Sequence, residues 1–102
     1  MELGRVVGQV VSTIKLDGMS GTKLLVITAL DDPGSPSGDR PGATYVAVDR
    51  VGAGGGEVVL VTRGSGARIG AEAAEIDAAV VGIVDSVVMD GRLTFDKSTD
   101  TR

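Results

Sequence analysis

The stretch from Thr44 to Arg63, TYVAVDRVGAGGGEVVLVTR, places two apolar segments on either side of a glycine-rich turn. Residues 44–51 alternate, with Val46 and Val48 on one predicted face and the residues between them on the other. Residues 57–63 are rich in β-branched valine, which favours strands, while glycine tolerates the backbone conformations of tight turns. This stretch therefore predicts two strands joined by a turn.

The rest of the chain contains further strand patterns. They lie at 5–14, with a kink or bulge near Gly8; at 24–30; at 78–88, interrupted around Asp85; and at 92–95. Residues 24–30 (LLVITAL) are apolar on both faces, so we expect burial on both sides. Asp90-Gly91 is a strong hairpin signal and predicts that the last strand turns back on its predecessor.

The segments between these strands have different compositions. Residues 31–42 (DDPGSPSGDRPG) hold three Pro and three Gly, which predicts an exposed loop. Residues 67–75 (ARIGAEAAE) resemble a short helix, weakened by Gly70. We expect residues 96–102 to form a flexible polar tail beyond a single domain at 1–95.

Five to six short strands with one short helix predict a mainly β fold, a small closed or nearly closed barrel with a C-terminal hairpin. The 102 residues suit one domain. A small single-layer barrel cannot bury strands that are apolar on both faces unless its outside is covered. Another copy of the same chain is the simplest cover, so we expect a homo-oligomer.

Composition excludes several functional classes. A net charge of −4, with one Tyr and one Phe, disfavours nucleic acid, which needs a basic groove with stacking aromatics. The chain has no Cys and no His, so thiolate and imidazole chemistry are absent. The opening residues lack the pattern of a signal peptide, and no apolar run approaches the roughly 20 residues that span a bilayer. We therefore expect a cytoplasmic protein without a membrane partner.

The glycine clusters do not match nucleotide-binding motifs. No Gly-Lys pair exists, which excludes a Walker A loop, and the run at 52–57 (GAGGGE) leads into a predicted strand rather than a helix. Carboxylates are the remaining catalytic candidates: Asp49, Glu57, Asp77 and Asp85 lie among apolar residues. Turn capping and subunit contacts explain these positions more simply than an acid–base pair.

Several ordered blocks resemble a known family. They are 3–8 (LGRVVG), 21–25 (GTKLL), 46–57 (VAVDRVGAGGGE), 59–68 (VLVTRGSGAR) and 77–85 (DAAVVGIVD). Over about residues 2–90 the chain resembles the EutN/CcmL family of bacterial microcompartment vertex proteins. The family usually reads Gly-Ser-Ser-Ala-Arg where this chain has Gly64-Ser65-Gly66-Ala67-Arg68.

The resemblance implies a five-stranded barrel similar to the oligonucleotide-binding (OB) fold, assembled as a homopentamer. Such pentamers close the five-fold vertices of a shell whose facets are hexameric proteins. It implies a structural protein in the microcompartment shell, without enzymatic activity, cofactor or metal. Two alternatives stay open: an OB-like module that binds a small ligand or a protein strand, and a small carboxylate-dependent enzyme.

The resemblance also suggests roles for individual residues. Gly64, Ser65 and Gly66 are candidates to line a narrow pore at the five-fold axis. Arg68 is a candidate for an intersubunit hydrogen bond or ion pair, with Glu57 or Asp49 as its partner. Ala67 and Val81 are further candidates for the subunit interface. Alternatively, Gly64 and Gly66 only supply turn geometry and Arg68 is solvated.

Overall fold

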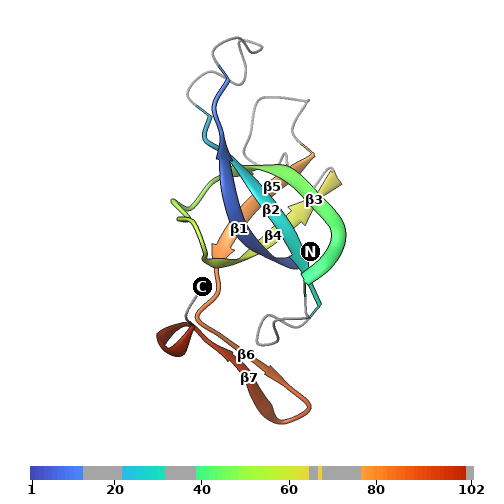
Figure 1. The fold of residues 1–102 in the computed structure, drawn as a ribbon, viewed down its shortest axis with the longest axis vertical. Coiled ribbons are helices and arrows are strands. Elements are labelled where there is room, and N and C mark those ends of the chain that lie inside the picture. The colour runs from blue at the N-terminus through green and yellow to red at the C-terminus, as the bar shows by residue number, and fades with distance from the viewer. Residues whose placement is uncertain (13–21, 32–38, 65–66, 68–76, 101–102) are drawn as a thin grey trace.

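The computed structural model describes residues 1–12, 22–31, 39–64, 67 and 77–100. Its strands are β1 (Glu2–Val10), β2 (Leu24–Leu30), β3 (Asp39–Asp49), β4 (Val58–Arg63), β5 (Ala78–Ile83), β6 (Ser86–Met89) and β7 (Arg92–Asp96). A 3-10 helix, η3 (Lys97–Thr99), follows β7. The first five strands form a closed barrel and the last two a separate hairpin, as Figure 1 shows. The mainly β, five-stranded barrel predicted from the sequence is confirmed.

The barrel does not follow chain order around its circumference. Its strands run β1-β2-β3-β5-β4 and close back onto β1. All neighbours are antiparallel except β3 and β5, which pair in parallel at Val48 with Ala79 and at Asp49 with Val80. The connection between β3 and β4, residues 50–57, therefore passes β5, which lies between these two strands in the barrel.

The predicted irregularity in the first strand is confirmed. The pairing of β1 with β2 shifts between Val6 and Gly8, so Val7 has no partner residue in that ladder. An extra residue of this kind is a β-bulge, which bends the strand and increases its twist. The bulge lets β1 curve around the barrel, pairing with β2 along its length and with β4 at its start.

Aliphatic side chains fill the barrel interior. The buried cluster consists of Val6, Leu25, Ile27, Ala47, Ala53, Val59, Val61, Ala78 and Val80, with Tyr45 and Ile83 packed against it. Ile27 has no exposed surface. A Cβ at Gly4 would collide with the Ile27 side chain, so glycine is required there for packing. The side chains of β4 alternate: Val59 and Val61 belong to the interior cluster, while Val58 and Leu60 contribute to the outside.

A second apolar cluster lies on the outside of the barrel, under the hairpin. It contains Leu30, Val58, Val84 and Phe95, with Leu3, Leu60 and Val87 packed against it. The predicted hairpin turn is confirmed, since Asp90 and Gly91 both have positive φ, 53° and 73°. Two consecutive positive φ values are the signature of a type I′ turn, whose twist matches the flanking strands.

Two segments differ from their sequence-based descriptions. The exposed loop expected at 31–42 is shorter, because β3 begins at Asp39, which pairs with Leu30. Pro41 is tolerated in this strand because β5 pairs with β3 only near Asp49, which leaves the first half of β3 as an edge. The tail expected from residue 96 starts instead with the end of β7 and η3. The helix predicted at 67–75 lies outside the described residues except for Ala67.

Candidate subunit-contact surfaces

Asp49 holds the glycine-rich loop after β3. Its Oδ1 accepts hydrogen bonds from the backbone N–H groups of Val51, Gly52 and Ala53, at 3.1, 3.0 and 3.2 Å. Its Oδ2 lies 3.5 Å from Lys23 Nζ, which also donates to the Ala53 carbonyl at 3.1 Å. Burial by itself would raise the pKa of Asp49, but the three backbone donors and the lysine outweigh it and lower that pKa. The side chain is 2% exposed, so it acts inside the chain.

Glu57 holds the other end of the same loop. Its Oε1 accepts from the Gly54 N–H at 2.6 Å, and its Oε2 accepts from Lys97 Nζ at 2.5 Å. The hydrogen bond from Lys97 and then the one from Gly54 lower the pKa of Glu57. Both carboxylates suggested as partners of Arg68 thus already have partners within the chain. Arg68 lies outside the described residues, and its intersubunit role stays a prediction.

Sequence reasoning missed a buried cation in the first strand. Arg5 is 4% exposed, and its Nη1 donates to the Gly56 carbonyl at 2.8 Å and to Asp100 Oδ2 at 3.0 Å. This ion pair ties the end of the chain to β1. A signal existed, since Arg5 stands alone as a charge between apolar residues of a predicted strand, but nothing in the sequence indicated Asp100 as its partner.

A polar cluster lies next to the predicted pore loop. Arg63 donates to Glu2 Oε1 at 3.0 Å and stacks over the Tyr45 ring, 4.2 Å from its centroid. These residues share the inward face of their strands, so they cover one mouth of the barrel. Burial and the nearby Glu2 charge raise the pKa of Tyr45. The cluster is compatible with a structural plug at this end.

Of the predicted pore residues, the structure describes Gly64. Its φ is +67°, a left-handed conformation that favours glycine, and its N–H donates to the Asp77 carbonyl at 2.7 Å. A Cβ there would meet no atom within 4 Å among the described residues. Turn geometry therefore explains Gly64, while Ser65 and Gly66 lie outside the described residues and their place at a pore stays a prediction.

The two apolar interface candidates lie in different environments. Ala67 has no exposed surface, whereas Val81 on β5 is 37% exposed. A neighbouring subunit can contact Val81 directly, whereas the Ala67 side chain is already buried. The substitution Ala67→Glu would therefore bury a charge within the chain before it affects any subunit contact. Both placements at an interface stay predictions.

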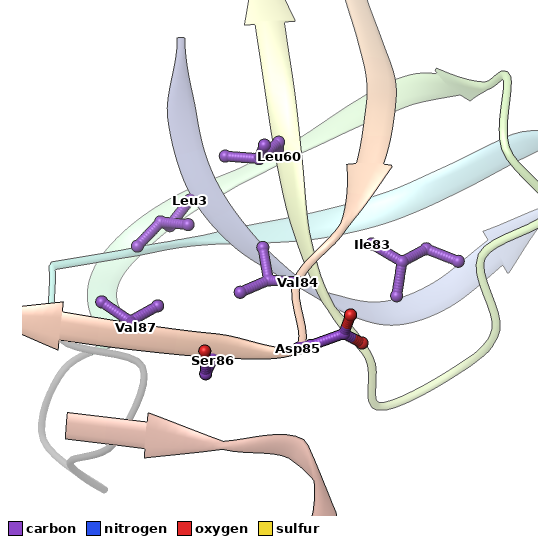
Figure 2. A pocket seen from close by; sticks show the side chains of 7 residues that line it. All are labelled: Leu3, Leu60, Ile83, Val84, Asp85, Ser86 and Val87. Atoms are coloured by element: carbon purple, nitrogen blue, oxygen red, sulfur yellow. The ribbon is translucent and has the colours of Figure 1, made fainter. Parts of the chain in front are cut away.

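An apolar groove runs between the barrel and the root of the hairpin. It has a volume of about 460 Å³ and is lined by Leu3, Leu60, Ile83, Val84, Asp85, Ser86 and Val87. Figure 2 shows the Leu3, Val84 and Val87 side chains gathered between β1 and β6, with the Asp85 carboxylate directed away from them. The groove therefore suits contact with an apolar surface, because, of the described residues that line it, only Asp85 and Ser86 have side chains that carry polar groups.

Within the described ranges, no three His, Cys, Asp or Glu side chains come together as a possible metal site. The described part of the chain also contains no helix long and apolar enough to cross a membrane. The arrangement of polar groups is thus one that shapes loops and joins segments: Asp49 and Glu57 on one loop, and Arg5 and Asp100 across the two ends of the chain.

Known proteins resemble this chain over most of its length. The family model described as ethanolamine utilisation protein EutN/carboxysome matches residues 1–85. The bacterial microcompartment shell vertex protein GrpN of Rhodospirillum rubrum is 54% identical over 89 residues, which are 85% of this chain and 96% of GrpN. The shell vertex protein EutN of Escherichia coli strain K12 is 41% identical over 99 residues, which are 95% of this chain and 100% of EutN.

Solved structures agree with these matches. The structure of CcmL from Gloeobacter violaceus superposes with a TM-score of 0.85 at 43% identity, covering 96% of this chain and 99% of CcmL. The GrpN structure from Rhodospirillum rubrum, described as a pentameric microcompartment shell protein, superposes with a TM-score of 0.74 at 52% identity, covering 87% of this chain and 100% of GrpN. Family model, relatives and structures lead to one conclusion: this chain belongs to the EutN/CcmL family.

Proposed function

We propose that this chain is a structural protein that forms homopentamers and closes the five-fold vertices of a bacterial microcompartment shell in the cytoplasm. The observation that carries the proposal is the 52% identity to a pentameric shell protein over 87% of the chain, with the same barrel. The relatives described above, GrpN, EutN and CcmL, are named as shell vertex proteins, which favours this role over the OB-like binding module.

The chain's own chemistry supports a structural rather than an enzymatic role. Two of the four carboxylates that were candidates for acid–base work, Asp49 and Glu57, are engaged by backbone N–H groups and lysines of the same chain. Carboxylates held this way, with lowered pKa values, are poor proton acceptors at neutral pH. Their function is to fix the loop at 50–57 on the barrel rim.

Within the pentamer, we expect the loop at 64–66 to approach the axis and the outer rim to meet hexameric shell proteins. A ring of identical chains uses two different patches on each subunit, because each contact joins one patch to the other. The apolar groove and the exposed Val81 provide surface for such contacts. Closure of a shell built from hexagonal units needs five-fold units at its vertices.

Native mass spectrometry of the purified chain tests the pentamer. We expect a species of five times the 10.3 kDa chain mass that persists on dilution. Co-expression with a hexameric microcompartment shell protein tests the vertex role: closed particles should form with this chain and open sheets or tubes without it. A monomer or dimer at all concentrations would contradict the proposal, and peptide and small-molecule binding would then be tested instead.

A further inference from the structure

Arg5 joins the loop between β3 and β4 to the end of the chain. Its Nη1 donates to the Gly56 carbonyl at 2.8 Å and to Asp100 Oδ2 at 3.0 Å. The Arg5 side chain is only 5% exposed, and a buried cation is stabilised by a carboxylate beside it. One nitrogen atom thus contacts both the loop and residues 96–100, which we call the strap and which follow the hairpin back toward the barrel in Figure 1.

Glu57 joins the same two segments at a second point. Its Oε1 accepts from the Gly54 N–H at 2.6 Å, and its Oε2 accepts from Lys97 Nζ at 2.5 Å. The side chains of Glu57 and Lys97 are 23% and 46% exposed, so water weakens their attraction more than that of the buried pair. The loop is therefore linked to the strap through a buried cation and through a partly exposed carboxylate.

The strap adds little packing of its own. The helix η3 contains no buried residue, and its cap is a local hydrogen bond to the Asp96 side chain, which moves with the strap. Besides the two ion pairs, the strap is attached by the Lys97 N–H, which donates to the Asp85 carbonyl at 2.9 Å. A segment held mainly by polar contacts at the surface opens at a lower free energy than the barrel.

The loop itself is held in two halves by different groups. Asp49 fixes the first half, residues 51–53, through three backbone hydrogen bonds that do not involve the strap. In the second half, residues 54–57, the Gly56 N–H donates to the Val6 carbonyl at 2.8 Å. Val6 follows Arg5 directly in β1, and the Gly56 carbonyl contacts the Arg5 side chain. A movement of Arg5 therefore reaches the second half of the loop before the first.

We propose that docking of the strap holds the second half of this loop in its observed conformation, so that the two segments open and close as one unit. When the strap leaves, the carboxylate of Asp100 leaves the buried Arg5. The guanidinium then gains by turning toward water, which releases the Gly56 carbonyl. Glu57 loses one of the two contacts that fix its side chain.

Such coupling is reciprocal by thermodynamic necessity. A partner that captures the strap away from the barrel loosens residues 54–57, and a partner that reshapes residues 54–57 loosens the strap. The end of the chain and the rim of the barrel are thus one conformational device. The inference concerns contacts within a single chain and does not depend on the proposed pentamer.

Amide hydrogen exchange of the full-length protein, followed by NMR, tests the coupling. The Lys97 amide monitors the strap, the Gly56 amide the second half of the loop and the Gly52 amide the first half. In Asp100→Asn we expect exchange at Lys97 and Gly56 to accelerate together, by about tenfold, because a hydrogen bond to a charged group is lost. Exchange at Gly52 should stay unchanged. Asp90→Asn, the matched control on the hairpin turn, should leave all three amides unchanged.

Glu57→Gln tests the coupling in the opposite direction while the buried pair of Arg5 and Asp100 stays intact. Although the substitution is in the loop, we expect faster exchange at Lys97 in the strap. Asp49→Asn is its matched control, since it neutralises a carboxylate in the other half of the loop. It should accelerate Gly52 and leave Lys97 unchanged.

Three results for Asp100→Asn would overturn the inference. Faster exchange at Lys97 with unchanged Gly56 would mean that the strap opens alone, and no change at either amide would mean that Asp100 holds neither segment. Acceleration of Gly52 together with Gly56 would mean that the loop opens as a whole. For the loop variants, unchanged Lys97 exchange in Glu57→Gln, or equal acceleration in Asp49→Asn, would overturn it as well. None of these results bears on the native mass, which tests the proposed function separately.

Discussion

The barrel interior and the C-terminal unit, β6 to η3, are held by different forces. The interior is a set of buried aliphatic side chains inside a closed ring of strand pairings. The C-terminal unit contacts the barrel through two apolar side chains, Val87 and Phe95, and through two ion pairs, Arg5 with Asp100 and Glu57 with Lys97. The backbone N–H of Lys97 also donates to the Asp85 carbonyl at 2.9 Å. The comparison teaches that the barrel interior is held by apolar packing, which is insensitive to pH and salt, whereas the C-terminal unit is held by a small apolar contact together with ion pairs.

The largest effect is expected inside the barrel. Ile27→Ala removes a fully buried side chain from a close-packed interior, so we expect a loss of about 2–5 kcal/mol in the free energy of unfolding. Urea denaturation measures it. Val46→Ala, at an exposed position on the neighbouring strand, is the control and should cost far less in the separated chain. Equal costs would mean that the interior is not the main source of stability.

The second largest effect is expected at the ion pair that attaches the C-terminal unit to the barrel, and it tests whether the two regions open independently. Asp100→Asn removes the charge that faces the buried Arg5, and hydrogen bonds to charged groups contribute about 1.5–3 kcal/mol. We expect hydrogen exchange to accelerate in η3 and β7 while amides of β2 and β4 keep their protection. Asp90→Asn is the matched control, because asparagine also suits the positive φ of that turn. Faster exchange throughout the barrel would show that the two regions are not separable.

The third effect is the dependence of the free energy of unfolding on acidic pH. The pKa values of Asp49 and Glu57 are lowered in the folded chain, so their stabilisation is present above the unfolded pKa values, near 4, and is lost as pH falls through the folded values. Asp49→Asn should reduce the slope of stability against pH below about pH 4. Acid titration followed by circular dichroism measures it. An unchanged slope would mean that the loop hydrogen bonds do not persist in solution.

The smallest effect is at the exposed ion pair. Lys97→Met removes the charge that faces Glu57, and exposed pairs are screened by salt. We expect the midpoint of unfolding to stay within experimental error, with faster exchange at Ser98 and Thr99 that is visible at low salt and disappears at high salt. A large shift of the midpoint would show that this pair, rather than Asp100, fixes the C-terminal unit.

Local patterns predicted the strands well. The bulge near Gly8, the break at Asp85 and the Asp90-Gly91 turn are short-range features, and the structure confirms each one. The start of β3 was predicted wrongly from composition. Pro41 indicates a loop unless the strand is known to lie at an edge of the sheet.

Long-range features could not be predicted from single segments. Nothing in the sequence showed that β5 lies between β3 and β4, or that Asp100 pairs with Arg5 over a separation of 95 positions. The candidate subunit interface could be predicted from the sequence only in part. The surplus of apolar strand faces predicted an oligomer, but the number of subunits, five, came from the family resemblance.

The ion pair between Arg5 and Asp100 also has a consequence for the order in which the chain folds during synthesis. Translation releases the first strand early and the residues around Asp100 late. The partner of Arg5, and the Phe95 side chain that packs in the outer apolar cluster beside Leu3, therefore reach the barrel at the end of synthesis. Contacts between distant positions form slowly because a long loop must close first. During that interval the apolar side chains of the first strand on the incomplete chain stay exposed to solvent and to other proteins. The last residues to be synthesised are thus the ones that cover and pair with the first strand.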